Sequence, residues 1–69
     1  MYPYIVIVQD GIVDEMFKCI DTEQVEKRFL DKCEEYISNW NEYTSGDIEC
    51  ILDDGYEKFI NGSINIVWC

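Results

Sequence analysis

Carboxylates are the side chains through which this sequence offers most of its chemistry. Fifteen Asp and Glu residues accompany five Lys and Arg residues, which gives a net charge of −10 at pH 7. Residues 33–57 contain eight of these acids and no Lys or Arg. The acids of this stretch are Glu34, Glu35, Glu42, Asp47, Glu49, Asp53, Asp54 and Glu57. A field of one sign attracts a cationic partner, although a charge run also serves simply as a solvated surface.

Carboxylates in this number can imitate the phosphates of a nucleic-acid backbone. An arginine contacts a carboxylate and a phosphate with the same bidentate geometry, so the groove of a nucleic-acid-binding protein would accept them. Trp40, Tyr43 and Tyr56 are interleaved with the acids and would supply aromatic anchors for an interface. Trp40 has an alternative role, because it also extends an apolar helical stripe and would then cap the core. We therefore predict a partner-binding surface made of the eight acids and these three aromatic residues.

A divalent-metal site is the second use for carboxylates, since Ca²⁺ and Mg²⁺ prefer oxygen ligands. The acids of residues 47–57 do not follow the spacing of a calcium-binding EF-hand loop, however. Zinc is disfavoured as well, because the chain has no His and its four Cys residues are 14, 17 and 19 positions apart. We expect neither a bound metal nor a cofactor.

Catalysis is not expected from this sequence. His, the commonest general base at neutral pH, is absent. No Ser or Cys lies in a recognisable nucleophile motif, and no Gly-rich phosphate loop occurs. A chain of 69 residues also has little room for a walled pocket. The sequence favours a non-enzymatic protein that acts by binding.

The N-terminal residues 1–8 are apolar but lack the basic region of a signal peptide. No apolar run approaches the ~18 residues that cross a bilayer. We therefore expect a cytoplasmic protein in which the four thiols, of Cys19, Cys33, Cys50 and Cys69, are reduced and Cys69 is the most exposed. Direct binding to nucleic acid or to an anionic membrane is not expected, because the chain has no Lys/Arg stripe.

The acids and aromatic residues must be positioned by the elements around them. Residues 4–8, Tyr-Ile-Val-Ile-Val, predict a strand that is covered on both faces or at least central in its sheet. Asp10-Gly11 predicts a tight turn into a second strand over 12–20. Pairing through this turn matches Val8 with Val13, Val6 with Glu15 and Tyr4 with Phe17. Because Glu15 would then lie among apolar neighbours, we expect a bulge near Asp14-Glu15.

Two helices are predicted after this hairpin. Asp21 and Gln24 form a capping signal for a helix over 22–39. Its apolar stripe consists of Val25, Phe29, Cys33, Tyr36, Ile37 and Trp40. A shorter helix over 45–54 begins at Thr44 or Ser45 as the cap and stops at Gly55.

The remaining residues predict a second hairpin, with strands over 56–60 and 63–68 joined by Asn61-Gly62. Phe59 is expected opposite Ile64. The order β-β-α-α-β-β predicts one α+β domain over residues 1–69: a four-stranded antiparallel sheet with the long helix packed on one face and the short helix at an edge. The apolar N-terminal strand is expected inside this sheet, beside the last strand.

The stretch 41–68 resembles small proteins encoded by bacterial and phage genomes. The residues that carry the likeness are Asn41-Glu42-Tyr43-Thr44, Asp47-Ile48, Leu52-Asp53-Asp54-Gly55-Tyr56, Gly62-Ser63-Ile64 and Ile66-Val67-Trp68. In size and acidity the whole chain is similar to phage-encoded inhibitors of bacterial defence, notably anti-CRISPR proteins, several of which mimic nucleic acid. The resemblance implies a CRISPR effector as the basic, nucleic-acid-binding partner. No site residue is carried over from it.

The first functional hypothesis is thus an inhibitor that places an anionic surface on a nucleic-acid-binding protein. The alternative is a homo-oligomeric or accessory domain whose acidity keeps it soluble. Its motivation is that two hairpins leave at least one open sheet edge for pairing. A monomer and a small homo-oligomer are both compatible with the sequence.

Overall fold

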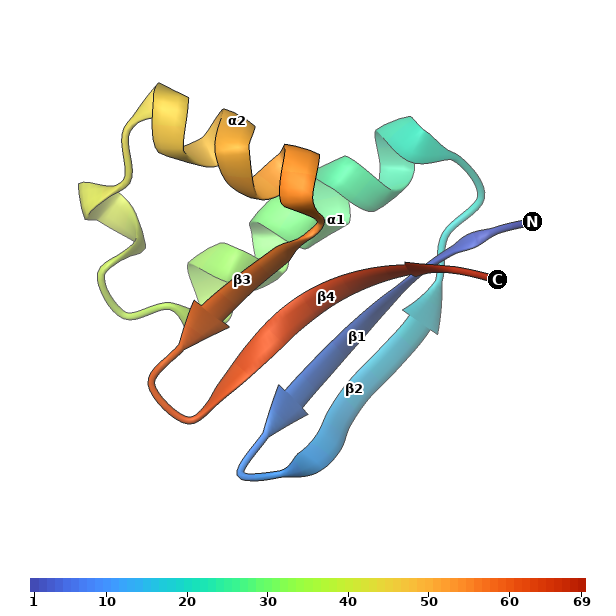
Figure 1. Ribbon diagram of the computed structural model, residues 1–69, viewed down its shortest axis with the longest axis horizontal. Helices are drawn as coiled ribbons and strands as arrows, with labels where there is room; N and C mark the ends of the chain where they lie inside the picture. Colours follow the sequence, from blue (N-terminus) through green and yellow to red (C-terminus); the bar gives the residue numbers. More distant parts are fainter.

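The computed structural model describes all residues, 1–69, as a four-stranded antiparallel sheet with two α-helices (Figure 1). The elements are β1 (Pro3–Gln9), β2 (Ile12–Lys18), α1 (Thr22–Tyr36), the 3-10 turn η1 (Trp40–Glu42), α2 (Ser45–Asp54), β3 (Tyr56–Phe59) and β4 (Gly62–Trp68). The strand order is β2-β1-β4-β3. This confirms the predicted α+β fold, and it places the N-terminal strand inside the sheet beside the last strand, as expected.

The first hairpin follows the predicted turn and contains the predicted bulge. Asp10 and Gly11 both have positive φ angles, 56° and 79°, which is the backbone that this kind of tight turn requires. Val8 pairs with Val13, as expected, and the bulge then leaves Asp14 without a partner. Beyond the bulge the predicted pairs are wrong by one residue. Glu15 lies opposite Ile7, and Phe17 lies opposite Ile5, because the extra residue shifts β2 along β1.

Helix α1 begins as predicted and ends earlier. Asp21 accepts a hydrogen bond from the Gln24 backbone N–H at 2.8 Å. The Gln24 side chain in turn accepts one from the backbone N–H of Ile20, also at 2.8 Å. The predicted end at residue 39 is wrong, because Ile37 already has extended backbone angles. Two turn-favouring residues, Ser and Asn, follow it, and Trp40 consequently lies in η1 and not on the stripe of α1.

Helix α2 spans the predicted residues 45–54. Thr44 is its cap: the hydroxyl accepts from the Asp47 N–H, and the Asp47 carboxylate accepts from the Thr44 N–H, a reciprocal capping box. Gly55 ends the helix in the left-handed region with φ 65° and donates its N–H to the Ile51 carbonyl. Every signal that defines α2 lies within a few residues of it.

The second hairpin departs from prediction in its turn. The strands close through Phe59 and Gly62, so the turn consists of Ile60-Asn61. Glu57, and not Phe59, lies opposite Ile64. Gly62 serves a different purpose from the one expected, since a Cβ at this position would lie 1.8 Å from the Val8 carbonyl oxygen. The glycine permits the close approach of β4 to β1.

The sheet has one covered face and one open face. Nine buried residues form the core between the sheet and the helices: Ile5, Ile7, Cys19, Val25, Phe29, Cys33, Ile37, Ile51 and Ile64. The helices lie on the side of the sheet to which Ile5 and Ile7 point (Figure 1), and α2 contacts the edge strand β3. β1 is therefore central, as expected, but the chain itself covers only one of its two faces.

Candidate partner-binding surface

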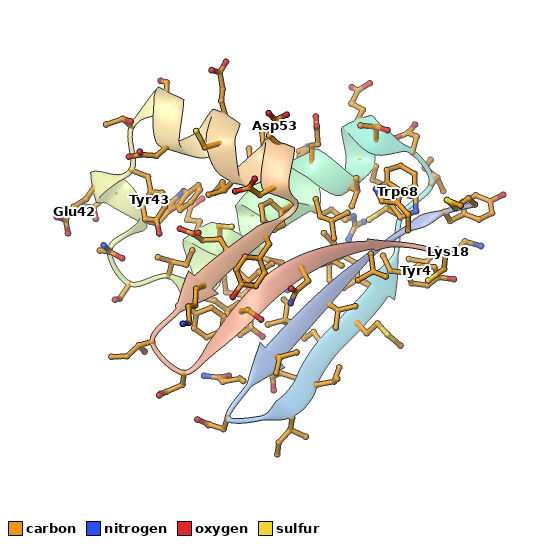
Figure 2. All side chains as sticks on the ribbon, viewed as in Figure 1. Tyr4, Lys18, Glu42, Tyr43, Asp53 and Trp68 are labelled. Carbon is orange, nitrogen blue, oxygen red and sulfur yellow. The ribbon has the colours of Figure 1, made fainter.

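The predicted acidic residues lie mainly on the helices. Seven of the eight are exposed, and Glu57 alone is half-buried. The exposed acids occupy the last turn of α1, the turn η1 and the whole length of α2. Glu42 and Asp53 point outward at separate places on this helical side, away from the sheet (Figure 2). We call the exposed acids of η1 and α2 the acidic surface; its members are Glu42, Asp47, Glu49, Asp53 and Asp54.

The carboxylates of α2 have no internal counter-charge. Ile51 is buried in the core and Leu52 packs against it, so the helical period turns Glu49 and Asp53 together toward solvent. These two acids are four residues apart, where like charges repel by a few tenths of a kcal/mol. The last turn of α2 also ends in two acids and contains no base, against the preference of the helix dipole. The charges of Glu49, Asp53 and Asp54 therefore oppose folding and have no partner of opposite charge within the chain, whereas Asp47 stabilises the start of α2 through its capping box.

Lys32 makes the only two salt bridges of the molecule, and one of them pairs a predicted surface acid, Glu35, with an internal cation. Its Nζ lies 3.1 Å from Glu15 and 3.1 Å from Glu35. Glu15 also accepts a hydrogen bond from the Tyr36 hydroxyl at 2.5 Å, and Asp14 accepts one from the same hydroxyl at 2.7 Å. The Tyr36 and Lys32 contacts lower the pKa of Glu15, and the hydrogen bonds to Glu15 and Glu35 raise the pKa of Lys32. Glu35 thus belongs to a structural network that ties β2 to α1.

Glu57 and two of the predicted aromatic anchors also hold the fold together. Glu57 points to the covered face, where its carboxylate accepts a hydrogen bond from the Tyr43 hydroxyl. This bond, with burial, raises the pKa of Tyr43 to about 12. The rings of Tyr43 and Trp40 are 4.7 Å apart, and both pack against the core. Trp40 therefore has the core-capping position that was its alternative role.

Tyr56 and Glu34 lie away from the acidic surface. Tyr56 pairs with Asn65 and points to the open face of the sheet, opposite to Glu57. Glu34 is exposed in the last turn of α1 and makes no salt bridge. The structure therefore leaves most of the predicted acids exposed, but Trp40 and Tyr43 pack against the core and Tyr56 lies on the other face of the sheet.

A cleft beside α2 supplies the aromatic contact that sequence reasoning assigned elsewhere. It has a volume of about 330 Å³ and combines acidic and apolar walls. Its acids are Glu26, Asp53 and Asp54, and its apolar side chains are Val25, Leu52, Ile66 and Trp68. Trp68 stands on the helical side at the end of β4 (Figure 2) and is 48% exposed. Glu26 was not predicted, because it lies outside the acidic stretch 33–57. Trp68 could have been found from the alternation of side chains along the last strand, which places it on the helical side of the sheet.

The potential metal ligands and the four thiols are distributed as follows. No three His, Cys, Asp or Glu side chains form a group that could hold a metal ion. All four cysteines are free; Cys19 and Cys33 are buried, whereas Cys50 and Cys69 are exposed. Burial raises the pKa of Cys33 to about 12, which favours the protonated thiol at neutral pH.

Comparison with known proteins identified no relative of this chain from which a function could be inferred. No protein-family model matches the chain, and neither the curated proteins nor the solved structures yielded a significant match. Neither of the two helices has the length and apolar composition needed to cross a membrane.

Proposed function

We propose that this chain is a non-enzymatic inhibitor whose acidic surface occupies a basic groove of a nucleic-acid-binding protein. A CRISPR effector is the partner class that we favour, with the chain acting as a phage anti-CRISPR in the bacterial cytoplasm. One observation carries the proposal: the carboxylates of η1 and α2 are exposed, none of them is in a salt bridge, and residues 33–57 contain no Lys or Arg. A surface that only kept the chain soluble would gain as much from mixed charges and would repel itself less.

The cleft next to α2 supports an arginine as the group that is recognised. A guanidinium is planar, remains charged and stacks on aromatic rings while it binds carboxylates in a bidentate manner. Asp53, Asp54 and Glu26 offer the carboxylates, and Trp68 offers an exposed indole beside them. Arginines are also the residues with which nucleic-acid-binding proteins contact phosphates. The determinants of binding are thus the acidic surface and the cleft, while Glu35, Trp40, Tyr43 and Glu57 maintain the fold.

Competition with nucleic acid tests this function directly. Purified RNA-guided effector complexes are mixed with labelled target DNA and increasing amounts of the chain, and bound DNA is measured by fluorescence anisotropy. We expect displacement of DNA at low salt that weakens as salt rises, because exposed charge contacts are screened. An interaction with the same affinity at about 50 mM and about 500 mM salt would exclude the electrostatic mechanism.

A pair of charge-matched variants localises the contact. Asp53→Asn/Asp54→Asn removes two charges from the cleft, and Asp10→Asn/Glu23→Gln removes two charges from the first turn and the start of α1. Both variants have the same net charge, so bulk electrostatics are equal. We expect the cleft variant to lose most of the displacement activity and the other variant to retain it. Equal activity of the two variants contradicts the assigned site.

The alternative function, an accessory domain with acidity for solubility, has a different expected result. Such a chain would displace no DNA from any effector, and neither pair of substitutions would change its behaviour beyond solubility. The uncompensated charge on α2 favours the inhibitor over this alternative, because it costs stability in every molecule.

A further inference from the structure

The open face of the sheet has a composition unlike that of the rest of this acidic molecule. The register assigns it the side chains of Tyr4, Val6, Val8, Val13, Met16, Lys18, Tyr56, Lys58, Ser63, Asn65 and Val67. None of these residues is an acid, although the chain contains fifteen. All carboxylates are therefore kept off the one large surface that the helices leave uncovered.

The side chains of β1 that point to the open face are apolar or aromatic, whereas a sheet face in contact with water usually carries polar side chains. An antiparallel sheet with one face in water alternates apolar residues on the inside with polar residues on the outside. β1 does not alternate in this way, because Tyr4, Val6 and Val8 point outward while Ile5 and Ile7 fill the core. Val67 of the neighbouring strand and Met16 of β2 extend the apolar area, and they are 40% and 64% exposed. A contiguous patch of this kind marks an interaction surface.

The Asn65 amide at the centre of the open face already has hydrogen-bond partners within the chain. The Asn65 Nδ2 donates to the Val6 carbonyl oxygen at 3.2 Å and to the Ser63 hydroxyl at 3.0 Å. Both N–H groups of this amide are thereby used within the chain. If the face were covered, these N–H groups would lose water but keep their partners within the chain. Burial of polar groups is costly mainly when they are left without a hydrogen-bond partner.

The two lysines of the open face lie at its rim. Lys18 is on β2 and Lys58 is on β3, and these are the two edge strands. The Lys18 ammonium is held 3.9 Å from the centre of the Tyr2 ring, and Figure 2 shows Lys18 and Tyr4 together at the end of the sheet. An uncharged centre with charges confined to the rim matches the usual anatomy of a protein interface.

We propose that the open face binds a second copy of this chain, sheet against sheet. Two molecules of net charge −10 repel each other in most orientations, but an acid-free face opposite an acid-free face keeps all carboxylates away from the contact. A patch with no charge at its centre is complementary to itself, as a two-fold interface requires. The helical sides then point outward on both copies. The inference is independent of the proposed inhibitor function, which uses the opposite side of the molecule.

The size of the face sets the strength of this dimer. Three strands of seven residues and one of four, about 4.8 Å apart and with about 3.3 Å per residue, give a flat footprint of roughly 400 Å² on each copy. This is at the small end of specific interfaces. We therefore expect a dissociation constant on the order of micromolar, so that the dimer dissociates on dilution.

Sedimentation velocity over a concentration series tests the proposal. We expect the mass to rise with concentration from the 8.2 kDa of one chain to twice that value. Raising the salt from about 50 mM to about 500 mM should strengthen the dimer, because like-charge repulsion is screened. This response is opposite in sign to that expected for the basic partner, so the two proposals fail separately.

Three variants with identical net charge locate the interface. Val67→Glu and Met16→Glu each place a carboxylate on the open face, and Ile60→Glu places one in the β3–β4 turn, where Ile60 is 93% exposed. We expect the first two to weaken the dimer at least tenfold and the third to leave it unchanged. Met16 is exposed on an edge strand, so its substitution leaves the core intact and remains informative even if Val67→Glu unfolds.

Two results would overturn the proposal. A wild-type chain that stays monomeric at about 1 mM and high salt would show that the open face does not bind a second copy. A dimer that survives both open-face substitutions, with protection of the β2 backbone amides from hydrogen exchange, would assign the contact to the sheet edge instead.

Discussion

The Tyr36 hydroxyl donates a hydrogen bond to the Glu15 carboxylate across 2.5 Å, and this contact joins the end of α1 to the bulged part of β2. The same carboxylate lies 3.1 Å from Lys32. Glu15 points to the covered face, opposite Ile7, where an unpaired charge would be costly. The bulge, the tyrosine and the lysine together explain how an acid is accommodated beside the core.

Replacement of Glu15 should therefore destabilise the chain. For Glu15→Gln we expect a loss of about 1 kcal/mol at pH 7, since the charge-assisted bonds to Tyr36 and Lys32 are removed while partial solvent exposure screens them. Thermal or urea unfolding followed by circular dichroism measures this change. Glu34→Gln is the matched control, because it removes the same charge from an exposed and unpaired position; an equal loss in both variants would contradict the network.

The effect of Glu15 should vanish in acid. The fold lowers the pKa of Glu15, so its contribution is present above the unfolded value of about 4.3 and is lost as the pH falls through the folded value. The wild-type and Glu15→Gln unfolding curves are thus expected to approach each other as the pH falls below the unfolded value and to coincide once it is below the folded one. A difference that persists at about pH 2 would show that the variant loses stability for another reason.

An opposite loss is expected in alkali. The fold raises the pKa of Tyr36 through its bonds to Glu15 and Asp14, and it raises the pKa of Lys32. Contributions from raised pKa values are complete below the unfolded values, near 10, and are lost as the pH rises toward the folded values. Tyr36→Phe should therefore show a smaller decline in melting temperature than the wild type above about pH 10. Parallel declines would contradict the assignment.

Two glycine substitutions should have opposite effects. In Gly62→Ala the added carbon would lie 1.8 Å from the Val8 carbonyl oxygen, so we expect a loss on the order of 3 kcal/mol or no folding. Gly46 is helical, and a Cβ there would meet only the Thr44 hydroxyl oxygen at an ordinary contact distance of 3.8 Å, so Gly46→Ala should stabilise the chain by about 0.5 kcal/mol. Chemical denaturation of both variants tests the close approach of β4 to β1, which a tolerated Gly62→Ala would rule out.

The four thiols should separate into two classes. Cys50 and Cys69 are exposed, whereas Cys19 and Cys33 are buried and have raised pKa values. We expect two fast reactions with Ellman's reagent in the folded chain and four after unfolding in guanidinium. Cys50→Ser and Cys69→Ser should each remove one fast reaction. A third fast thiol would place Cys19 or Cys33 at the surface.

Replacement of Trp40 should lower the stability of the chain, whereas replacement of Trp68 should weaken binding to the basic partner. Trp40 packs on Tyr43 and the core, so Trp40→Ala should lower the melting temperature by several degrees. Trp68 is half-exposed beside the acidic cleft, and Trp68→Ala should chiefly speed dissociation from the basic partner. Binding kinetics and thermal melts on both variants check this. Strong destabilisation without a binding defect in Trp68→Ala would leave the cleft without a role.

The sequence by itself determined the local parts of this structure. The Asp10-Gly11 turn, the Asp21 cap, the Thr44 capping box and the Gly55 stop depend on hydrogen bonds and backbone angles within about four residues. Such interactions are complete inside a short segment, so their positions were readable without the fold. The net charge and its concentration in residues 33–57 were readable for the same reason.

Only the tertiary structure decided which of these residues meet. Lys32 bridges Glu35 of its own helix and Glu15 of β2, and these three residues are brought together only because α1 packs on the face of the sheet to which Glu15 points. The cleft that joins Asp53 to Trp68 and the acid-free open face likewise depend on strands and helices far apart in the chain. Contacts between distant segments are selected by packing of the whole core, which local pattern does not contain.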